Sequence, residues 1–475
     1  MADTTQLAVV GAGPGGYTAA FHAADRGLSV TLIDDAPQPG GVCLHRGCLP
    51  SKALLHAAKI VTDAETSTRW GIDFGAPSID PVKLRAWKDE VVAKLTGGLG
   101  QLSTQRKVRY VQGRAAFADE HRLTVASPDA AGAQKEIVFE HAIVATGSRP
   151  ARPTTLALDD PRVLDSTRAL DVERVPASLL VVGGGYIGLE LGTVYAALGS
   201  VVTVVEMTSS LLPGADADLV RVLARRIGQI TEAVHLDTSV TRLAPAADGI
   251  DVSLEGPAIT EPVQRFESVL VAVGRVPNSD MVALDRTRVQ RDAHGFVRVD
   301  AQRRTAEPTI YAIGDVAGEP MLAHKAFHEA RVAVDAITGG ESAFAPRAIP
   351  AVVFTDPEVA WCGLTEAQAA EDGRPVTAAK FPWGASGRAL TLDRPDGVTK
   401  LLFDPETEQL LGVGIVGTGA GELIAEGVVA VEMGATASDL TRSIHPHPTL
   451  SETMMEAAEV FFGQSTHVYR SKKTR

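Results

Sequence analysis

The stretch that decides the fold is Gly40-Gly41-Val42-Cys43-Leu44-His45-Arg46-Gly47-Cys48-Leu49-Pro50-Ser51-Lys52, which holds two of the three cysteines in this 475-residue chain. Four residues separate these two cysteines. A disulfide needs Cα atoms within about 7 Å, but residues five apart point to different faces of a helix and lie roughly 16 Å apart in a strand. The segment is therefore predicted to fold back on itself, with Gly47 permitting the turn and Pro50 at the first position of the next helix.

Cys48 is then expected at the N-terminus of that helix. There the partial positive charge of the helix dipole favours a thiolate below the ordinary cysteine pKa of about 8.5. This environment suits redox chemistry better than structural cross-linking. The alternative is that Cys43 and Cys48 are buried, reduced residues that only fill space, because cysteine is often buried for packing. The motifs in the rest of the chain favour the redox interpretation.

Length and composition predict a globular protein of about three domains, with 45% hydrophobic residues. The formal net charge of −13 argues against nucleic acid and anionic membranes as partners. The N-terminus has no basic region or long apolar stretch, and no apolar run could span a bilayer. We therefore expect a cytoplasmic protein without membrane insertion. In that compartment a disulfide is more often catalytic or redox-sensing than structural.

A dinucleotide fingerprint lies near the N-terminus. The apolar run 7–10 predicts a buried strand that leads into Gly11-Ala12-Gly13-Pro14-Gly15-Gly16. In this motif Gly11 makes the turn, Gly13 lets the backbone approach a pyrophosphate, and Gly16 allows the next helix to pack on the strand. Asp34 follows Gly16 by eighteen residues and ends the second strand, where its carboxylate can accept hydrogen bonds from ribose hydroxyls. An ordinary glycine-rich turn is the alternative, but the strands, fingerprint and acid occur in the order that the motif requires.

The pattern recurs later in the chain. A second apolar run, 179–182, leads into another fingerprint, and Glu206 again follows its last glycine by eighteen residues. The alternative, a duplicate that has lost its ligand, is disfavoured because both the glycine spacing and the acid survive. Two dinucleotides are therefore predicted. The cofactor residues expected from the second fingerprint and from the strand returns of both units are Gly183, Gly185, Ile187, Gly188, Glu206, Thr146, Gly147, Ala272 and Gly274.

The positions of the motifs indicate which dinucleotide each unit binds. Cys43 follows Asp34 by nine residues, so the cofactor of the first unit must lie beside the cysteines. A flavin exchanges electrons with a dithiol on one side and hydride with nicotinamide on the other, which assigns FAD to the first unit and NAD to the second. No arginine in the run Met207–Ser210 is placed to receive a 2′-phosphate. NAD is therefore favoured over NADP.

Over essentially its whole length the chain resembles the pyridine nucleotide-disulfide oxidoreductases, and within them the branch that oxidises protein-bound dihydrolipoamide. The most specific motifs are 40–52, 183–190, 309–315 and 445–452. The resemblance implies an α/β fold with two Rossmann-like dinucleotide-binding domains and a C-terminal α+β dimerisation domain. It also implies a homodimer that uses FAD and NAD and no metal. The partners implied are the lipoyl domains of 2-oxo-acid dehydrogenase complexes or of the glycine cleavage system.

The resemblance also implies roles for further residues. Lys52 would lie near the flavin N5 and pair with Glu190, and Asp315 would bind the ribityl chain. The residues alone leave other possibilities open: Asp315 could cap the following helix, Lys52 could be a surface lysine, and Glu190 would need some partner on its packed helix. By the resemblance, further FAD contacts are Ala115 and Ala323, and the NAD site is completed by Val240, Ala272, Gly274 and Arg275.

The candidate base is His447, which lies between two prolines that restrain its backbone. Glu452 should fall in the first turn of the next helix, where it can hydrogen-bond one ring nitrogen and raise the basicity of the other. A loop histidine is more often structural or merely exposed. The family motif favours His447 as the base but gives His445 no such role. By resemblance, the base would act on the neighbouring subunit.

In the mechanism that the resemblance implies, a substrate thiolate attacks Cys43, and Cys48 becomes the thiolate beside the flavin. The predicted domains are 1–153 for FAD and the redox disulfide, 154–275 for NAD, 276–347 as a return segment completing the FAD and central region, and 348–475 for dimerisation. Cys362, in the last of these, is most simply a packing residue.

Related enzymes are less consistent with the sequence. Mercuric reductases and large thioredoxin reductases need extra redox residues near the C-terminus, and no cysteine follows Cys362. A glutathione reductase would be expected to use NADP, which the region around Glu206 does not suit. A non-catalytic subunit or scaffold is a further alternative, but it would be favoured by loss of the cysteines, of His447 or of a fingerprint, and all of these are present.

Overall fold

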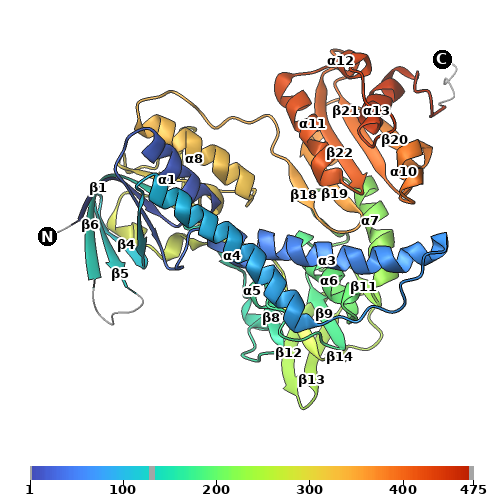
Figure 1. Ribbon diagram of the computed structural model, residues 1–475, viewed down its shortest axis with the longest axis horizontal. Coiled ribbons are helices and arrows are strands. Elements are labelled where there is room, and N and C mark those ends of the chain that lie inside the picture. Colours follow the sequence, from blue (N-terminus) through green and yellow to red (C-terminus); the bar gives the residue numbers. More distant parts are fainter. Residues whose placement is uncertain (1–2, 128–133, 470–475) are drawn as a thin grey trace.

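The first fingerprint lies in a sheet whose central strands are parallel. The computed structural model describes residues 3–127 and 134–469 (Figure 1). In this first unit, β1 lies between β2 and β6 and runs parallel to both. Leu7, Ala8 and Val9 are fully buried, as expected for a parallel strand that is covered on both faces. The sheet order is β3-β2-β1-β6-β5-β4, with β17 also paired to β6. Its strands are β1 (Asp3–Val10), β2 (Val30–Asp34), β3 (Arg109–Gln112), β4 (Arg114–Asp119), β5 (Arg122–Ala126), β6 (Gln134–Val144) and β17 (Ile310–Ala312).

The helices of the first unit place the redox stretch next to the fingerprint. Helix α1 starts within the fingerprint, at Pro14, and packs against α8. The redox stretch forms the short helix α2 and the start of the long helix α3, which packs against α4. The helices are α1 (Pro14–Asp25), α2 (Gly41–Arg46), α3 (Cys48–Ser67), α4 (Pro81–Gln105) and α8 (Ala323–Ile337).

The second fingerprint begins the same arrangement again, in a second unit. Its parallel sheet has the order β11-β10-β9-β15-β8, and β12, β13 and β14 form a separate antiparallel sheet. Strands β7 and β16 pair with each other between the two units. The strands are β7 (Ser148–Pro150), β8 (Val163–Asp165), β9 (Ser178–Val182), β10 (Val201–Val205), β11 (Ala233–His235), β12 (Ser239–Ala246), β13 (Gly249–Glu255), β14 (Val263–Phe266), β15 (Ser268–Val271) and β16 (Arg275–Pro277), and the helices are α5 (Ser166–Ala169), α6 (Tyr186–Ala197) and α7 (Ala217–Ile230).

The C-terminal region is an antiparallel sheet covered by helices. Its strand order is β18-β19-β22-β21-β20. Helix α11 packs on β22 and β19, and α13 packs on β20 and β21. Its elements are β18 (Ala351–Val353), β19 (Glu358–Gly363), β20 (Thr377–Pro382), β21 (Val398–Phe403), β22 (Leu410–Gly417), α9 (Glu366–Glu371), α10 (Gly387–Thr391), α11 (Ala420–Met433), α12 (Ala437–Arg442) and α13 (Glu452–Phe462).

Helix α3 runs between the second unit and the C-terminal region, which lie on opposite sides of it in Figure 1. Its buried residues Leu54, Leu55 and Ala58 belong to one hydrophobic cluster with residues of both parts, including Val194 of α6 and Val359 of β19. Burial of apolar surface contributes about 25 cal/mol per Å², so this shared cluster fixes the redox helix against both neighbours.

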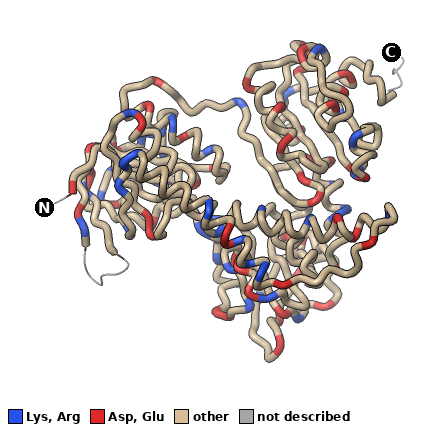
Figure 2. Tube along the Cα trace, viewed as in Figure 1, with Lys and Arg blue, Asp and Glu red and all other residues tan. Residues whose placement is uncertain are grey.

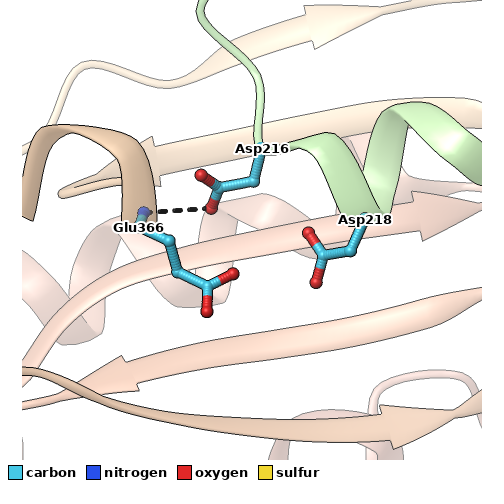
Figure 3. A group of neighbouring side chains, drawn as sticks. All are labelled: Asp216, Asp218 and Glu366. Atoms are coloured by element: carbon cyan, nitrogen blue, oxygen red, sulfur yellow. Dashed lines mark hydrogen bonds between the residues drawn. The ribbon is translucent and has the colours of Figure 1, made fainter. Parts of the chain in front are cut away.

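An ion network around the buried Lys400 also joins the second unit to the C-terminal region. Asp216, Asp218 and Glu366 bring their carboxylates together between α7 and α9 (Figure 3). Lys400 of β21 places its ammonium 2.6, 2.7 and 2.8 Å from them, respectively. Burial lowers the pKa of Lys400, but the three carboxylates outweigh this and raise it. The carboxylates thus surround a lysine, and the cluster is a structural link between the two parts.

Acidic and basic side chains are interspersed over all parts of the molecule in Figure 2. Within residues 3–127 and 134–469, no helix combines the length and the apolar character needed to cross a membrane.

Candidate active site

A cavity of about 470 Å³ opens between the sheet of the first unit and the N-terminal ends of α3 and α6. Its wall combines the first fingerprint with both cysteines of the redox stretch. It therefore places a dinucleotide-binding loop and a dithiol around one space. The sequence-predicted residues that line it are Gly11, Gly13, Asp34, Cys43, Cys48, Lys52, Ala115, Thr146, Gly147, Ile187, Glu190, Arg275, Asp315 and Ala323.

The glycines bring the fingerprint and the redox stretch into direct contact. A Cβ at Gly16 would lie 1.8 Å from the carbonyl oxygen of Gly11, so α1 packs tightly on its strand. A Cβ at Gly41 would lie 2.4 Å from the Cα of Gly13. Helix α1 begins at the cavity wall without a side-chain cap. Its first N–H groups are thus free of side-chain acceptors and suited to a pyrophosphate.

Asp34 connects the fingerprint to the end of β2. Its Oδ2 accepts the Ala12 N–H at 2.6 Å, and its Oδ1 accepts the Ala36 N–H at 2.9 Å. Burial raises the pKa of Asp34, although both hydrogen bonds oppose this effect. The carboxylate borders the cavity, where its remaining lone pairs can accept ribose hydroxyls.

Cys43 and Cys48 are free thiols that hydrogen-bond to each other. The hydrogen bond with Cys48 and burial raise the pKa of Cys43. The pKa of Cys48 is lowered to about 7, chiefly by the hydrogen bond from Cys43 and then by the charge of Lys52, against the opposing effect of burial. Cys48 is exposed to the cavity, so it does not merely fill space in the core.

The sequence predicted the direction of the Cys48 pKa shift but attributed it to the helix dipole. The hydrogen bond from Cys43 is the larger cause.

The expected place of Pro50 was wrong. Helix α3 begins at Cys48, so Pro50 is its third residue. Proline fits there because the N–H groups of the first turn have no partner within the helix. Gly47 makes the junction between α2 and α3, where a Cβ would lie 2.9 Å from the carbonyl oxygen of Val42.

Lys52 and Glu190 form the expected ion pair. The Lys52 ammonium lies 3.1 and 2.9 Å from the two carboxylate oxygens of Glu190. Glu190 is almost fully buried, and its Oε1 also accepts the backbone N–H of Phe354 at 2.9 Å. The pair thus joins the redox helix to α6, and it has a third partner from the C-terminal region.

Asp315 lies in a short 3-10 helix, Gly314–Ala317, that follows β17. Its Oδ2 accepts the hydroxyl of Ser148 at 2.5 Å. The Arg275 Nε donates to the same hydroxyl at 2.7 Å. The buried Glu329 supports this turn by accepting the Gly314 N–H at 2.6 Å. Asp315 and Arg275, expected to bind different cofactors, thus meet through one serine at the cavity wall.

Glu206 repeats the geometry of Asp34 in the second unit. Its Oε2 accepts the Gly184 N–H at 2.7 Å, and its Oε1 accepts the backbone N–H and the hydroxyl of Thr208, each at 2.8 Å. Helix α6 starts after Gly185 without a side-chain cap, and a Cβ at Gly185 would meet no atom within 4 Å. This bare helix start fits a second pyrophosphate.

The remaining residues expected around the second dinucleotide lie near this fingerprint. A Cβ at Gly183 would come within 2.4 Å of the Ala272 carbonyl oxygen, and one at Gly188 within 2.1 Å of the Gly183 carbonyl oxygen. Gly274 has φ +122° and open space around it. Val240 lies on β12 and packs against the hydrophobic cluster of the second unit.

His447 and Glu452 are hydrogen-bonded as expected, with 2.8 Å between Nδ1 and Oε1. Burial raises the pKa of Glu452, but the hydrogen bonds from the Thr449 N–H and from His447 outweigh this and lower it. The carboxylate is therefore ionised and acts only as an acceptor. The His447 Nδ1 therefore donates in this hydrogen bond, and Nε2 is the ring nitrogen on its other side.

His447 lies away from the cysteines of its own chain. Among the residues that the structure describes, those that line the cavity all fall between Val10 and Ala326 in the sequence. His447 follows α12, which lies far from the start of α3 in Figure 1. Its side chain is 76% exposed. The neighbouring His445 differs, because its side chain is 7% exposed and pairs with Glu426 at 2.7 Å.

Comparison with known proteins identifies the family. The model described as pyridine nucleotide-disulphide oxidoreductase matches residues 5–330, and the model of the corresponding dimerisation domain matches residues 349–458. The chain belongs to the pyridine nucleotide-disulphide oxidoreductases. This membership confirms the predicted fold class and the expected cofactors FAD and NAD, and the second match supports a homodimer.

Relatives in the family match the chain over nearly its full length. The dihydrolipoyl dehydrogenase of Vibrio cholerae is 47% identical over 467 residues, which cover 98% of each chain. That of Haemophilus influenzae is 47% identical over 468 residues, 98% of this chain and 97% of the relative. Among solved structures, LpdA from Mycobacterium tuberculosis has a TM-score of 0.88 at 27% identity and covers 96% of this chain and 99% of its own. The flavoprotein disulfide reductase RclA from Escherichia coli, as a Cu(II) complex, has a TM-score of 0.85 at 26% identity, with coverage of 96% and 99%.

The structure adds site residues that the sequence did not indicate. Ser148 links Asp315 to Arg275, and Phe354 contacts Glu190. Tyr186 also lines the cavity, and burial raises its pKa to about 12. Only Tyr186 had a local signal, as the one aromatic residue inside the second fingerprint. Ser148 and Phe354 act through partners more than a hundred residues away, for which no short motif exists.

Proposed function

We propose that this chain is a dihydrolipoyl dehydrogenase, which oxidises protein-bound dihydrolipoamide and reduces NAD. One observation carries the proposal: a dithiol with unequal thiol pKa values shares a cavity with a dinucleotide fingerprint. The dihydrolipoyl dehydrogenases of two bacteria, each 47% identical, support the choice of substrate.

The first step is proton transfer from the substrate dithiol to a base. His447 accepts this proton at Nε2, because the ionised Glu452 holds its Nδ1–H. The resulting imidazolium is stabilised by the same carboxylate. The substrate thiolate attacks Cys43 Sγ in the oxidised enzyme, so that a bond to substrate sulfur forms as the Cys43–Cys48 bond breaks.

Cys48 leaves as a thiolate, which its pKa of about 7 favours at neutral pH. The second substrate thiol then attacks the substrate sulfur that is bonded to Cys43. The bond from that sulfur to Cys43 Sγ breaks, and the proton of the attacking thiol passes to the departing Cys43 thiolate, whose pKa is raised. This closes the lipoamide disulfide and leaves both enzyme cysteines reduced. The chemistry that a bound FAD would supply is two-electron transfer between this dithiol and NAD.

The chain supplies distinct sites for the two cofactors. For FAD, Asp34 would hold the ribose, the start of α1 the pyrophosphate, and Asp315 the ribityl chain. Lys52 would lie at the flavin N5. For NAD, the bare start of α6 would hold the pyrophosphate and Glu206 the ribose. Further contacts would come from Ala115, Thr146, Gly147 and Ala323 for FAD, and from Ile187, Val240, Ala272, Gly274 and Arg275 for NAD.

His447 would reach the cysteines from a second copy of the chain. Within one chain it is exposed and outside the cavity wall, while the match to a dimerisation domain over 349–458 includes it. The proposed segments stay those predicted from the sequence: 1–153, 154–275, 276–347 and 348–475. The proposed partners are lipoyl domains of a 2-oxo-acid dehydrogenase complex or of the glycine cleavage system, in the cytoplasm.

Anaerobic reduction of the purified protein tests this function. We expect a yellow protein with one FAD per chain that dihydrolipoamide reduces and that NAD, far better than NADP, reoxidises. Glutathione in place of dihydrolipoamide should give no turnover. Reduction by glutathione but not by dihydrolipoamide would refute the proposed substrate, and a colourless, folded protein would refute the flavin mechanism.

Replacing Glu206 by Gln should weaken the preference for NAD, because the Glu206 carboxylate repels a 2′-phosphate.

A further inference from the structure

Phe354 of the C-terminal region touches both members of the Lys52–Glu190 pair. Its ring lies beneath the Lys52 ammonium, with 4.5 Å from Nζ to the ring centroid. Its backbone N–H donates to Glu190 Oε1 at 2.9 Å. One residue therefore fixes the carboxylate through its main chain and the ammonium through its side chain.

We propose that Phe354 is a positioning residue for the redox reaction, which holds the charge of Lys52 at the distance from Cys48 that favours the Cys48 thiolate. Lys52 lies one helical turn after Cys48 on α3, and both line the cavity. Phe354 is not part of the cavity wall, so it acts on Cys48 only through Lys52 and Glu190, the two residues that it contacts.

The Lys52 side chain needs such support because one side of it faces the cavity. Lysine has a flexible four-carbon stem, and its side chain here is 31% exposed. The carboxylate of Glu190 attracts the ammonium but permits rotation around its two oxygens. The face of an aromatic ring supplies a second attraction from a different direction, since its quadrupole presents negative charge to a cation.

The loop that carries Phe354 is itself well fixed. Phe354 follows β18 directly, and Val353 pairs with Val359 of β19. Val353 and Val359 are buried in the hydrophobic cluster that also contains Leu54 of α3, and Phe354 packs against it. The ring is thus anchored to the same core as the redox helix, so its position relative to Lys52 is set by packing.

A pH titration of reduced holoenzyme tests the proposal. In a Cys43→Ser background, the long-wavelength flavin band reports the Cys48 thiolate, an assignment that rests on the proposed function. Phe354→Leu keeps the backbone donor but removes the ring. We expect it to lower the acid dissociation constant of Cys48 about two- to fivefold. Phe354→Tyr should restore the parent value, and a ring-fluorinated phenylalanine, which keeps the shape but weakens the quadrupole, should fall between.

Two control variants show whether a shift in the Cys48 titration comes from the charge of Lys52. Lys52→Met removes the charge and should shift the titration further than Phe354→Leu. Phe21→Leu removes a ring that contacts another cation, Arg106, at 5.1 Å and outside the cavity wall, and should not shift the titration.

A Phe354→Leu titration equal to the parent, or a Lys52→Met titration equal to the parent, would overturn the inference. If Phe354→Leu loosens the fold, the fluorinated ring decides instead. A titration of that variant equal to the parent would then overturn the inference. Absence of the band in the parent would instead refute the proposed placement of Cys48 at the flavin. Activity with dihydrolipoamide is measured separately, so its absence refutes the proposed function while the titration still decides the role of Phe354.

Discussion

The Cys43–Cys48 pair and the His447–Glu452 pair are each formed by two side chains five residues apart, yet their surroundings differ. The thiols lie at the wall of a cavity shared with the first fingerprint, and their pKa values are moved in opposite directions. The histidine is 76% exposed and lies outside that wall. Under the proposed function, the cysteine pair transfers electrons and the histidine pair accepts a proton. The fold would then place the two halves of one thiol-oxidation site on different regions.

The largest effect should come from removing either thiol. Cys43→Ser and Cys48→Ser should each reduce dihydrolipoamide turnover to background, because the exchange needs both sulfurs. Cys362→Ala is the matched control. Cys362 is buried in the C-terminal region, and burial raises its pKa to about 12. Its loss should leave turnover unchanged, and normal turnover in either active-site variant would refute the dithiol mechanism.

Removing the base should have the next largest effect. His447→Gln should lower the rate of dihydrolipoamide oxidation by about 10²–10⁴-fold, the usual contribution of general-base catalysis. Electron exchange between NADH and the flavin should change far less, because no substrate thiol takes part. His445→Gln in the same loop is the control and should reduce oxidation by much less. Equal losses in the two variants would assign the effect to loop structure and not to the base.

Loss of the carboxylate behind the base should have a smaller effect. Glu452→Gln leaves His447 in place but removes the charge that orients and stabilises it. A hydrogen bond to a charged group contributes about 1.5–3 kcal/mol, which predicts a decrease of about 10–100-fold in dihydrolipoamide oxidation. Glu426→Gln, which alters the partner of His445, is the matched change. If Glu452→Gln is as active as Glu426→Gln, the carboxylate has no special part in the site.

The pH dependence of the thiols sharpens the comparison further. The folded protein lowers the Cys48 pKa to about 7, so its thiolate is present above pH 7 and lost as the pH falls through that value. The pKa of Cys43 is raised, so Cys43 stays protonated across this range. Absorbance of the reduced enzyme should therefore show one thiol titrating near pH 7. Two thiols titrating together near the ordinary cysteine pKa would contradict the unequal pair.

Local patterns in the sequence predicted those parts of the site that depend on local geometry. The fingerprint glycines were predictable because close approaches such as the one at Gly16 exclude side chains. The His447–Glu452 hydrogen bond was predictable because both residues flank one helix start. The contacts of Ser148 and of Phe354 were not, because their partners come from distant segments and are set by the packing of whole regions.

The same distinction explains the Cys48 pKa. A helix start can be read from a glycine and a proline, and the sequence therefore suggested the dipole as the cause. The larger cause, the hydrogen bond from Cys43, depends on how α2 turns into α3 at Gly47. The ion network around the buried Lys400 could not be predicted from the sequence either, since its three carboxylates come from two regions.

Mixing inactive variants tests most directly whether the two halves meet between chains. The Cys43→Ser and His447→Gln homodimers are allowed to exchange subunits, and heterodimers are counted by mass spectrometry with isotope-labelled chains. Each heterodimer would have one intact shared site, so random pairing should restore about a quarter of the wild-type activity. Wild type mixed with the doubly substituted chain gives the converse arrangement, in which heterodimers should be inactive. Recovery in the first mixture with inactive heterodimers in the second is the predicted result. Proven exchange without recovery in the first, or active heterodimers in the second, would contradict the shared site.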